Sequence, residues 1–143
     1  MSRPEELPEG TMGRVESAVR RHHIVSLVGR PNVVVEQVVK PIAEILRRPV
    51  TQIEIDWEQA AGYPSPFWTR VSEAAGEGLA VLTHEGELPE KSQQILLMRK
   101  LRAFYEMNNL KNAVIVVSES ERMKHGHDEM GRVANFDLRV PTD

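Results

Sequence analysis

The chain has 143 residues, of which 41% are hydrophobic and 27% are charged, and its formal net charge is -3. This length suits one domain with a buried core, which argues against a disordered chain, and the small negative charge gives no electrostatic basis for binding nucleic acid or a membrane surface. The lack of cysteine excludes disulfides, thiol catalysis and cysteine-ligated metal. Since no apolar run approaches the roughly 20 residues of a membrane-spanning helix, and the N-terminus has no signal-peptide core, we expect a cytoplasmic protein.

The first 13 residues are rich in proline, glutamate and glycine and offer little to bury. We therefore expect a flexible lead-in ahead of a single domain over residues 14–143. The pattern at Arg14–His22 predicts a short helix that ends in a basic cluster, which consists of Arg20, Arg21, His22 and His23. Such a cluster is most often a solvated helix end, and ligand binding is the alternative interpretation.

An apolar run at residues 24–29 predicts the first strand, and Asn32 is the expected N-cap of a helix over Val33–Arg48. Apolar residues at spacings of three and four give this helix a buried face, which comprises Val35, Val38, Val39, Ile42, Ile45 and Leu46. Pro41 should kink or restart the helix. A second strand follows at residues 50–56.

An irregular region follows, where Gly62, Pro64 and Pro66 indicate a turn and residues 67–75 indicate a short helix. Both tryptophans and two further aromatic residues fall within it, namely Trp57, Tyr63, Phe67 and Trp68. An aromatic core under a long loop is the more common origin of such a cluster, and a partner-binding surface is the functional alternative. As a working hypothesis, we predict that these four side chains bind a protein partner.

The second half alternates strands and helices. Strands are predicted at residues 79–83, 113–117 and 134–140, and the strongest helix pattern spans Glu90–Met107, with an apolar stripe of Ile95, Leu96, Met98, Leu101, Phe104 and Tyr105. The nearly all-apolar run at 113–117 is typical of a strand covered on both faces. The chain as a whole therefore predicts one α/β domain of three layers, with a mainly parallel core sheet of about five strands.

Four short segments resemble parts of P-loop NTPases. Residues 25–33 (VSLVGRPNV) resemble the opening of translation-factor-related GTPases, and residues 79–89 (LAVLTHEGELP) are similar to the Walker B strand and turn of AAA+ ATPases. Residues 112–118 resemble the sensor strand, and residues 135–140 resemble the final core strand. The resemblance implies a P-loop NTPase-like, AAA+-like fold, and any bound nucleotide would then contact Gly29, Arg30, Asn32 and Ser118.

The same comparison implies that the phosphate-binding residues have been lost. In the G-x-x-x-x-G-K-[ST] pattern the second glycine lets the backbone wrap the phosphates, the lysine binds them and the hydroxyl holds Mg²⁺. Counting from Gly29, those three positions hold Val34, Val35 and Glu36. His84 replaces the aspartate that would hold the metal, and Glu85 retains the acidic position that would polarise water. We therefore expect no ATP or GTP hydrolysis and no cofactor.

Two other constellations stay open. His84 together with His125, His127 and Asp128 would suit a metal, although solvated loop histidines are the more common case. The preferred function is a non-catalytic interaction or regulatory module that binds a protein partner or self-associates as a subunit of a larger assembly. One alternative is a nucleotide- or metal-dependent hydrolase with His84 and Glu85 as catalytic residues. The other is a structural assembly protein.

Overall fold

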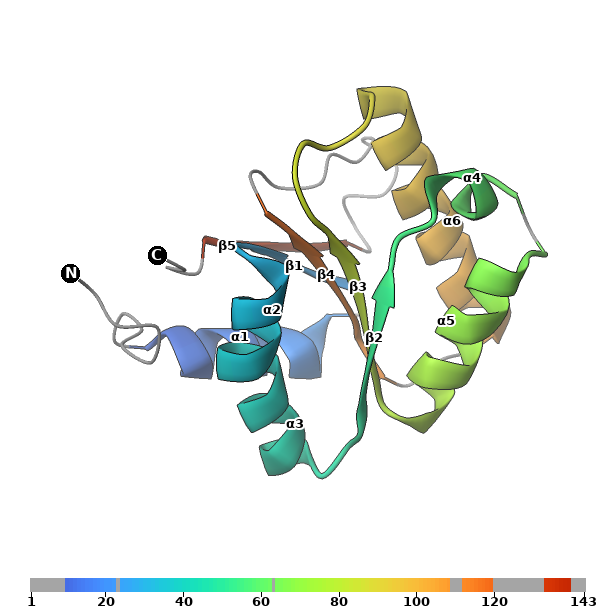
Figure 1. Cartoon of the computed structure of the whole chain (residues 1–143). Helices are drawn as coiled ribbons and strands as arrows, with labels where there is room; N and C mark the ends of the chain where they lie inside the picture. Colours follow the sequence, from blue (N-terminus) through green and yellow to red (C-terminus); the bar gives the residue numbers. More distant parts are fainter. Residues whose placement is uncertain (1–9, 23, 63, 109–111, 120–132, 140–143) are drawn as a thin grey trace.

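A computed structural model describes residues 10–22, 24–62, 64–108, 112–119 and 133–139 of the chain. Its strands form one sheet in the order β2-β3-β4-β1-β5, and all the pairings are parallel (Figure 1). The strands are β1 (Ile24–Val28), β2 (Val50–Glu54), β3 (Leu79–His84), β4 (Val114–Ser118) and β5 (Val133–Arg139). The predicted α/β class with a parallel sheet is confirmed.

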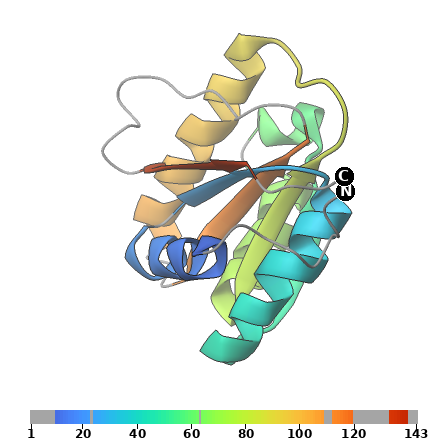
Figure 2. The same cartoon turned by 90° about the vertical axis from the view of Figure 1, so that its left-hand side faces the viewer.

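Helices cover both faces of the sheet (Figure 2). One layer contains α1 (Thr11–Arg21), α2 (Pro31–Val34), the π-helical segment η1 (Val35–Val39) and α3 (Lys40–Leu46). The other contains α4 (Trp57–Ala60), α5 (Pro66–Glu77) and α6 (Lys91–Asn108). Each layer packs on its own cluster of apolar side chains, and alternate residues of β1, β3 and β4 contribute to one cluster or the other. This is why those strands read as continuous apolar runs.

The helix that follows β1 differs from expectation at its start and in its middle. Arg30, rather than Asn32, is the N-cap residue, and Asn32 lies inside the first turn. Pro31 accounts for this, because its fixed φ and missing N–H suit the first helical position. Ahead of Pro41 the helix widens into η1, and the N–H of Lys40 donates to the carbonyl of Val35, five residues back. The chain thus passes Pro41 through a π-helical turn.

Two apolar residues predicted to be buried are exposed. The exposed fraction is 57% for Ile45 and 37% for Leu96, so both predictions are wrong. Ile45 lies at the end of α3, and the buried positions of that helical layer end at Ile42 and Ala43. In α6 the buried face is shifted by one residue, and Gln94, Leu97, Met98, Leu101 and Phe104 point inward. The side chain of Tyr105 lies outside the described residues.

The β2 strand begins at a close approach of two backbones. The Leu79 N–H donates to the Pro49 carbonyl at 2.9 Å. A Cβ added at Gly78 would lie 2.3 Å from that carbonyl oxygen. Only glycine fits there, because a backbone atom cannot move aside as a flexible side chain can. Gly78 therefore sets how the start of β3 meets the start of β2.

Candidate functional site at the carboxyl edge of the sheet

The carboxyl ends of β1, β3 and β4 bring three of the predicted site residues together. Ser118 pairs with Val28 on one side and with His84 on the other, and the N–H of Gly29 donates to the Ser118 carbonyl at 2.9 Å. Sites of parallel α/β proteins form at this edge because the strand-to-helix connections lie there. Gly29 and His84 therefore lie on either side of Ser118 at this edge.

The connection from β1 to α2 is short. Strand β1 ends at Val28 and α2 starts at Pro31, so that only Gly29 and Arg30 join them. Val34 and Val35 have exposed fractions of 0% and 2% and pack in the cluster beneath the helix. Glu36 is exposed and forms an ion pair with Lys40 one turn further on. The two valines thus belong to the core and do not face the sheet edge.

The turn after β3 is organised around His84. The indole N–H of Trp57 donates to Nδ1 of His84 at 3.2 Å. Nε2 of the same histidine lies 2.6 Å from the Glu87 carbonyl oxygen. A carbonyl can only accept, so Nε2 carries the hydrogen and Nδ1 has the lone pair that the indole uses. The two rings meet edge to face, with centroids 5.6 Å apart. Both nitrogens of His84 are therefore engaged, and a metal would have to displace one of these partners.

A second contact holds the same turn from the residue that follows β4. The N–H of Gly86 donates to Oε2 of Glu119 at 2.7 Å. Gly86 has φ of 80°, in the left-handed region that favours glycine. The turn is thus fixed at both sides, by His84 at the end of β3 and by Glu119, the residue that follows β4. The sequence offered one signal for Glu119, namely its place directly after a buried strand.

Glu85 points to a different surface. It lines a hollow of about 360 Å³ together with Gln52, Glu54 and Thr83. Within the described part of the chain, no group of three or more histidine or carboxylate side chains is placed to hold a metal ion. Three of the four candidate metal ligands, His125, His127 and Asp128, lie outside the described residues. The predicted metal site therefore stays a prediction.

The aromatic residues of the 57–68 segment divide into two groups. Phe67 and Trp68 are 0% and 1% exposed, and the Trp68 indole N–H donates to the Ala60 carbonyl at 3.1 Å. These two rings are core residues, which corrects the prediction that they form part of a contact surface. Trp57 is only partly buried, and Tyr63 lies outside the described residues. Buried tryptophan is stable here because its one donor has a partner.

A local signal for this burial was present in the sequence. Ser65 is the N-cap of α5 and Pro66 is its first residue, a common helix start. Phe67 and Trp68 then precede Val71, Ala74 and Ala75 at helical spacing on the buried face. The Phe67 N–H also donates to Oε1 of Gln59 at 2.8 Å. No local sequence pattern predicts this hydrogen bond.

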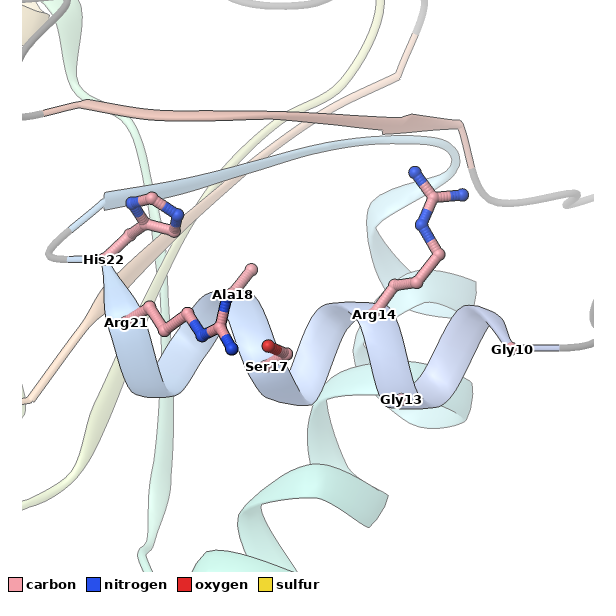
Figure 3. A pocket seen from close by; sticks show the side chains of 7 residues that line it. All are labelled: Gly10, Gly13, Arg14, Ser17, Ala18, Arg21 and His22. Atoms are coloured by element: carbon pink, nitrogen blue, oxygen red, sulfur yellow. The ribbon is translucent and has the colours of Figure 1, made fainter.

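The basic cluster at the end of α1 borders an open groove of about 450 Å³, whose lining residues are Gly10, Gly13, Arg14, Ser17, Ala18, Arg21 and His22. Figure 3 shows Arg14 near one end of the groove and Arg21 with His22 near the other. Arg20 forms an ion pair with Glu16 at 3.1 Å. The positive charges are therefore spread along the helix instead of converging on one point.

Comparisons with known proteins identify the fold. No protein-family model matches the chain, and no curated protein matches it. The solved structure of PCH-2 from C. elegans is similar, with 13% identity and a TM-score of 0.50 over 92% of this chain and 42% of that chain. CDC6P from Pyrobaculum aerophilum is similar with 14% identity and a TM-score of 0.52, over 94% of this chain and 45% of that one.

These structural neighbours include AAA+ ATPase-related proteins, which supports the resemblance to P-loop NTPases. At this identity the likeness shows the fold alone. The chain spans less than half the length of these two neighbours. Among the helices in the described ranges, none is both long and apolar enough to cross a membrane.

Proposed function

We propose that this domain is a non-catalytic protein-interaction or regulatory module on an AAA+-like fold, and that it acts as a subunit of a larger assembly. The observation that carries the proposal is the two-residue connection between β1 and α2. A phosphate-binding loop needs several residues between strand and helix, because their N–H groups must surround the phosphates. Gly29 and Arg30 alone are too few for this.

The side chains that follow the connection support the same conclusion. The position of the phosphate-binding lysine holds Val35, which is buried, and the position of the Mg²⁺-binding hydroxyl holds Glu36. A carboxylate beside a triphosphate would repel it. Phosphoryl transfer depends almost entirely on positioning and charge neutralisation, so losing both groups removes the basis of the reaction.

The end of β3 supports the loss of metal chemistry. The position of the metal-binding aspartate holds His84, whose two nitrogens bond Trp57 and the Glu87 carbonyl. Glu85 would then be an acidic residue without the metal and phosphates that give it a role. The hydrolase alternative requires Glu85 to act in the hollow beside Glu54, where a second carboxylate adds repulsion for an anionic substrate.

For the interaction surface we propose Trp57 and the turn over residues 85–88. Trp57 and Leu88 are partly buried and pack against the same apolar cluster, so each leaves part of an apolar side chain accessible to a partner. Tryptophan at such a position is a frequent source of binding energy. The turn is held by His84 and Glu119, and a preordered turn loses little entropy when it binds.

The proposal is tested by nucleotide binding and turnover with the full chain. We expect no calorimetric heat of binding and no melting shift with Mg·ATP or Mg·GTP, and no phosphate release above the buffer blank, with an active AAA+ ATPase as the positive control. Turnover in repurified protein that is lost in Glu85→Gln would refute the non-catalytic assignment and favour the hydrolase alternative.

The interaction surface is tested separately. The tagged chain and its Trp57→Ala variant are compared for co-purifying proteins, with Glu58→Ala, an exposed neighbour in α4, as the matched control. We expect Trp57→Ala alone to lose the co-purifying protein while the chain stays folded. Equal recovery with both variants would rule out Trp57 as the contact.

A further inference from the structure

Strand β2 lies at one end of the sheet and pairs only with β3 among the described strands. Its second edge has no neighbouring strand in the part of the chain that the structure describes. An unpaired edge can accept another strand, and proteins usually block this with charges, prolines or short strands. The charges on β2 are arranged in a way that opposes one kind of pairing and favours another.

The backbone groups that face this edge belong to alternate residues. The Pro49 carbonyl accepts from Leu79 and the Ile55 N–H donates to Thr83, so the odd-numbered residues bond β3. In a parallel ladder the even-numbered residues then direct their N–H and C=O groups outward. These residues are Val50, Gln52 and Glu54, and no described strand pairs with β2 on that side.

The side chains of the same residues share one face. Val50 packs beside α3 with Arg48 in one hollow, and Gln52 and Glu54 line the next hollow on that face. Gln52 and Glu54 are exposed. The edge is therefore basic where β2 starts, at Arg47 and Arg48, and acidic where β2 ends, at Glu54.

We propose that β2 pairs with β2 of a second copy of this chain, antiparallel, about a two-fold axis at Gln52. Val50 then lies opposite Glu54 of the other copy, and Gln52 lies opposite its own counterpart. The N–H and C=O groups of all three outward residues then form hydrogen bonds with the β2 strand of the other copy. The two sheets become one continuous sheet. Each copy has one β2 edge and the two-fold contact uses it on both copies, so the pairing stops at a dimer.

Charge selects the direction of this pairing. In the antiparallel arrangement the basic start of one strand meets the acidic end of the other, and Arg48 reaches Glu54 of the second copy as a diagonal neighbour. In a parallel arrangement like charges would meet. The Gln52 side chains face each other across the axis and can exchange hydrogen bonds. The charges on β2 thus oppose parallel pairing with β2 of a second copy and favour antiparallel pairing.

The contact is small, so the dimer should be reversible and dependent on concentration and salt. Analytical ultracentrifugation of the full chain, over a series up to its solubility limit, should show a monomer–dimer equilibrium that weakens in high salt. A monomer at every concentration would refute the proposal. The inference is separate from the proposed loss of nucleotide chemistry, and each can fail while the other stands.

The decisive test uses charge reversal. Arg48→Glu alone and Glu54→Arg alone each place like charges at both contacts, so each variant should be monomeric where the natural chain is half dimeric. An equimolar mixture restores opposite charges at both contacts and should form the heterodimer. Both residues are exposed, and Glu77→Arg, at the exposed end of α5, is the control. A dimer that both variants keep, or a mixture that stays monomeric, would overturn the proposal.

A backbone variant tests the strand pairing itself. Gln52→Pro removes an outward N–H and leaves the odd-numbered bonds to β3 in place, because edge strands tolerate proline on their free side. We expect loss of the dimer with folding retained by circular dichroism. A dimer of unchanged affinity would refute pairing through β2. If this variant unfolds, the charge-reversal mixture decides the question.

Discussion

Two strand-to-helix connections lie at the carboxyl edge of the sheet, with β4 between the strands that they follow, and they are built in opposite ways. Between β1 and α2 the chain uses Gly29 and Arg30 and then returns to the core with Val34 and Val35. Between β3 and α6 it uses residues 85–90, which are held on the surface by hydrogen bonds with the side chains of His84 and Glu119. The first connection serves packing, and the second presents polar groups to solvent. A connection at the carboxyl edge of the sheet therefore does not have a chemical role because of its position alone.

The largest expected effect comes from placing a cation in the helical segment that follows the first connection. Val35→Lys should lower the free energy of unfolding by about 3 kcal/mol or more, because an ammonium would replace an apolar side chain in the core. Chemical denaturation measures the loss. Glu36→Lys, one residue further and exposed, is the matched control and should cost less than about 1 kcal/mol. A folded Val35→Lys protein that gains ATP binding would show that the lysine position still faces a phosphate site.

The helix that follows the second connection tests whether the surface turn rests on a rigid base. Leu101→Ala in α6 should cost about 3 kcal/mol, since Leu101 is fully buried and its removal leaves a cavity. Leu96→Ala, on the exposed face of the same helix, should cost about 0.5 kcal/mol. Thermal melts of both variants provide the comparison. Similar melting shifts would mean that the inward face of α6 is assigned wrongly.

The bond between His84 and Trp57 tests how far the second connection depends on side chains. His84→Ala should cost about 1–2 kcal/mol, because the partly buried indole N–H loses its acceptor, and the Trp57 fluorescence should change. Glu85→Ala, the exposed neighbour, should leave both unchanged. A double-mutant cycle with Trp57→Phe should give a coupling of about 0.5 kcal/mol or more. Additive effects would indicate that the bond contributes nothing.

The smallest expected effect concerns the turn backbone. Gly86→Ala should cost about 1 kcal/mol, since alanine is strained at φ of 80° although its Cβ has space. Gly76→Ala provides a control of opposite sign. That glycine lies in α5 with open space around it, so alanine should stabilise the helix by about 0.5–1 kcal/mol. If both variants shift the melting temperature in the same direction, backbone strain at Gly86 is not the cause.

The sheet was predictable because its central strands are apolar on both faces. In β4 all five residues are buried, and the matching run of β-branched residues was visible in the sequence. The edge strand β2 has one buried residue, Ile53, and its other four residues are exposed or only partly buried. Whether a strand is central or at an edge of the sheet can thus be recognised from how many of its residues are apolar.

The site was less predictable because its contacts join distant parts of the chain. Trp57 and His84 are 27 positions apart, and Gly86 and Glu119 are 33 apart. No periodicity signals such a pair. Composition also could not separate Trp57, which is partly exposed, from Trp68, which is buried. Gly29, His84 and Ser118 lie at one edge of the sheet because the strands that precede them are parallel, but the hydrogen bonds of His84 follow from the three-dimensional arrangement.

The π-helical segment Val35–Val39 gives the β1-to-β2 crossover a tolerance to changes in length. A π turn corresponds to a single residue inserted into an α-helix, and removing one residue there would restore regular spacing. Because each residue turns an α-helix by about 100°, the same deletion after Lys40 would rotate Ile42 and Ala43 away from the sheet. One-residue deletions should therefore be accepted within Val35–Val39 and rejected in α3. The helical segment between β1 and β2 should therefore tolerate a one-residue change in length at Val35–Val39.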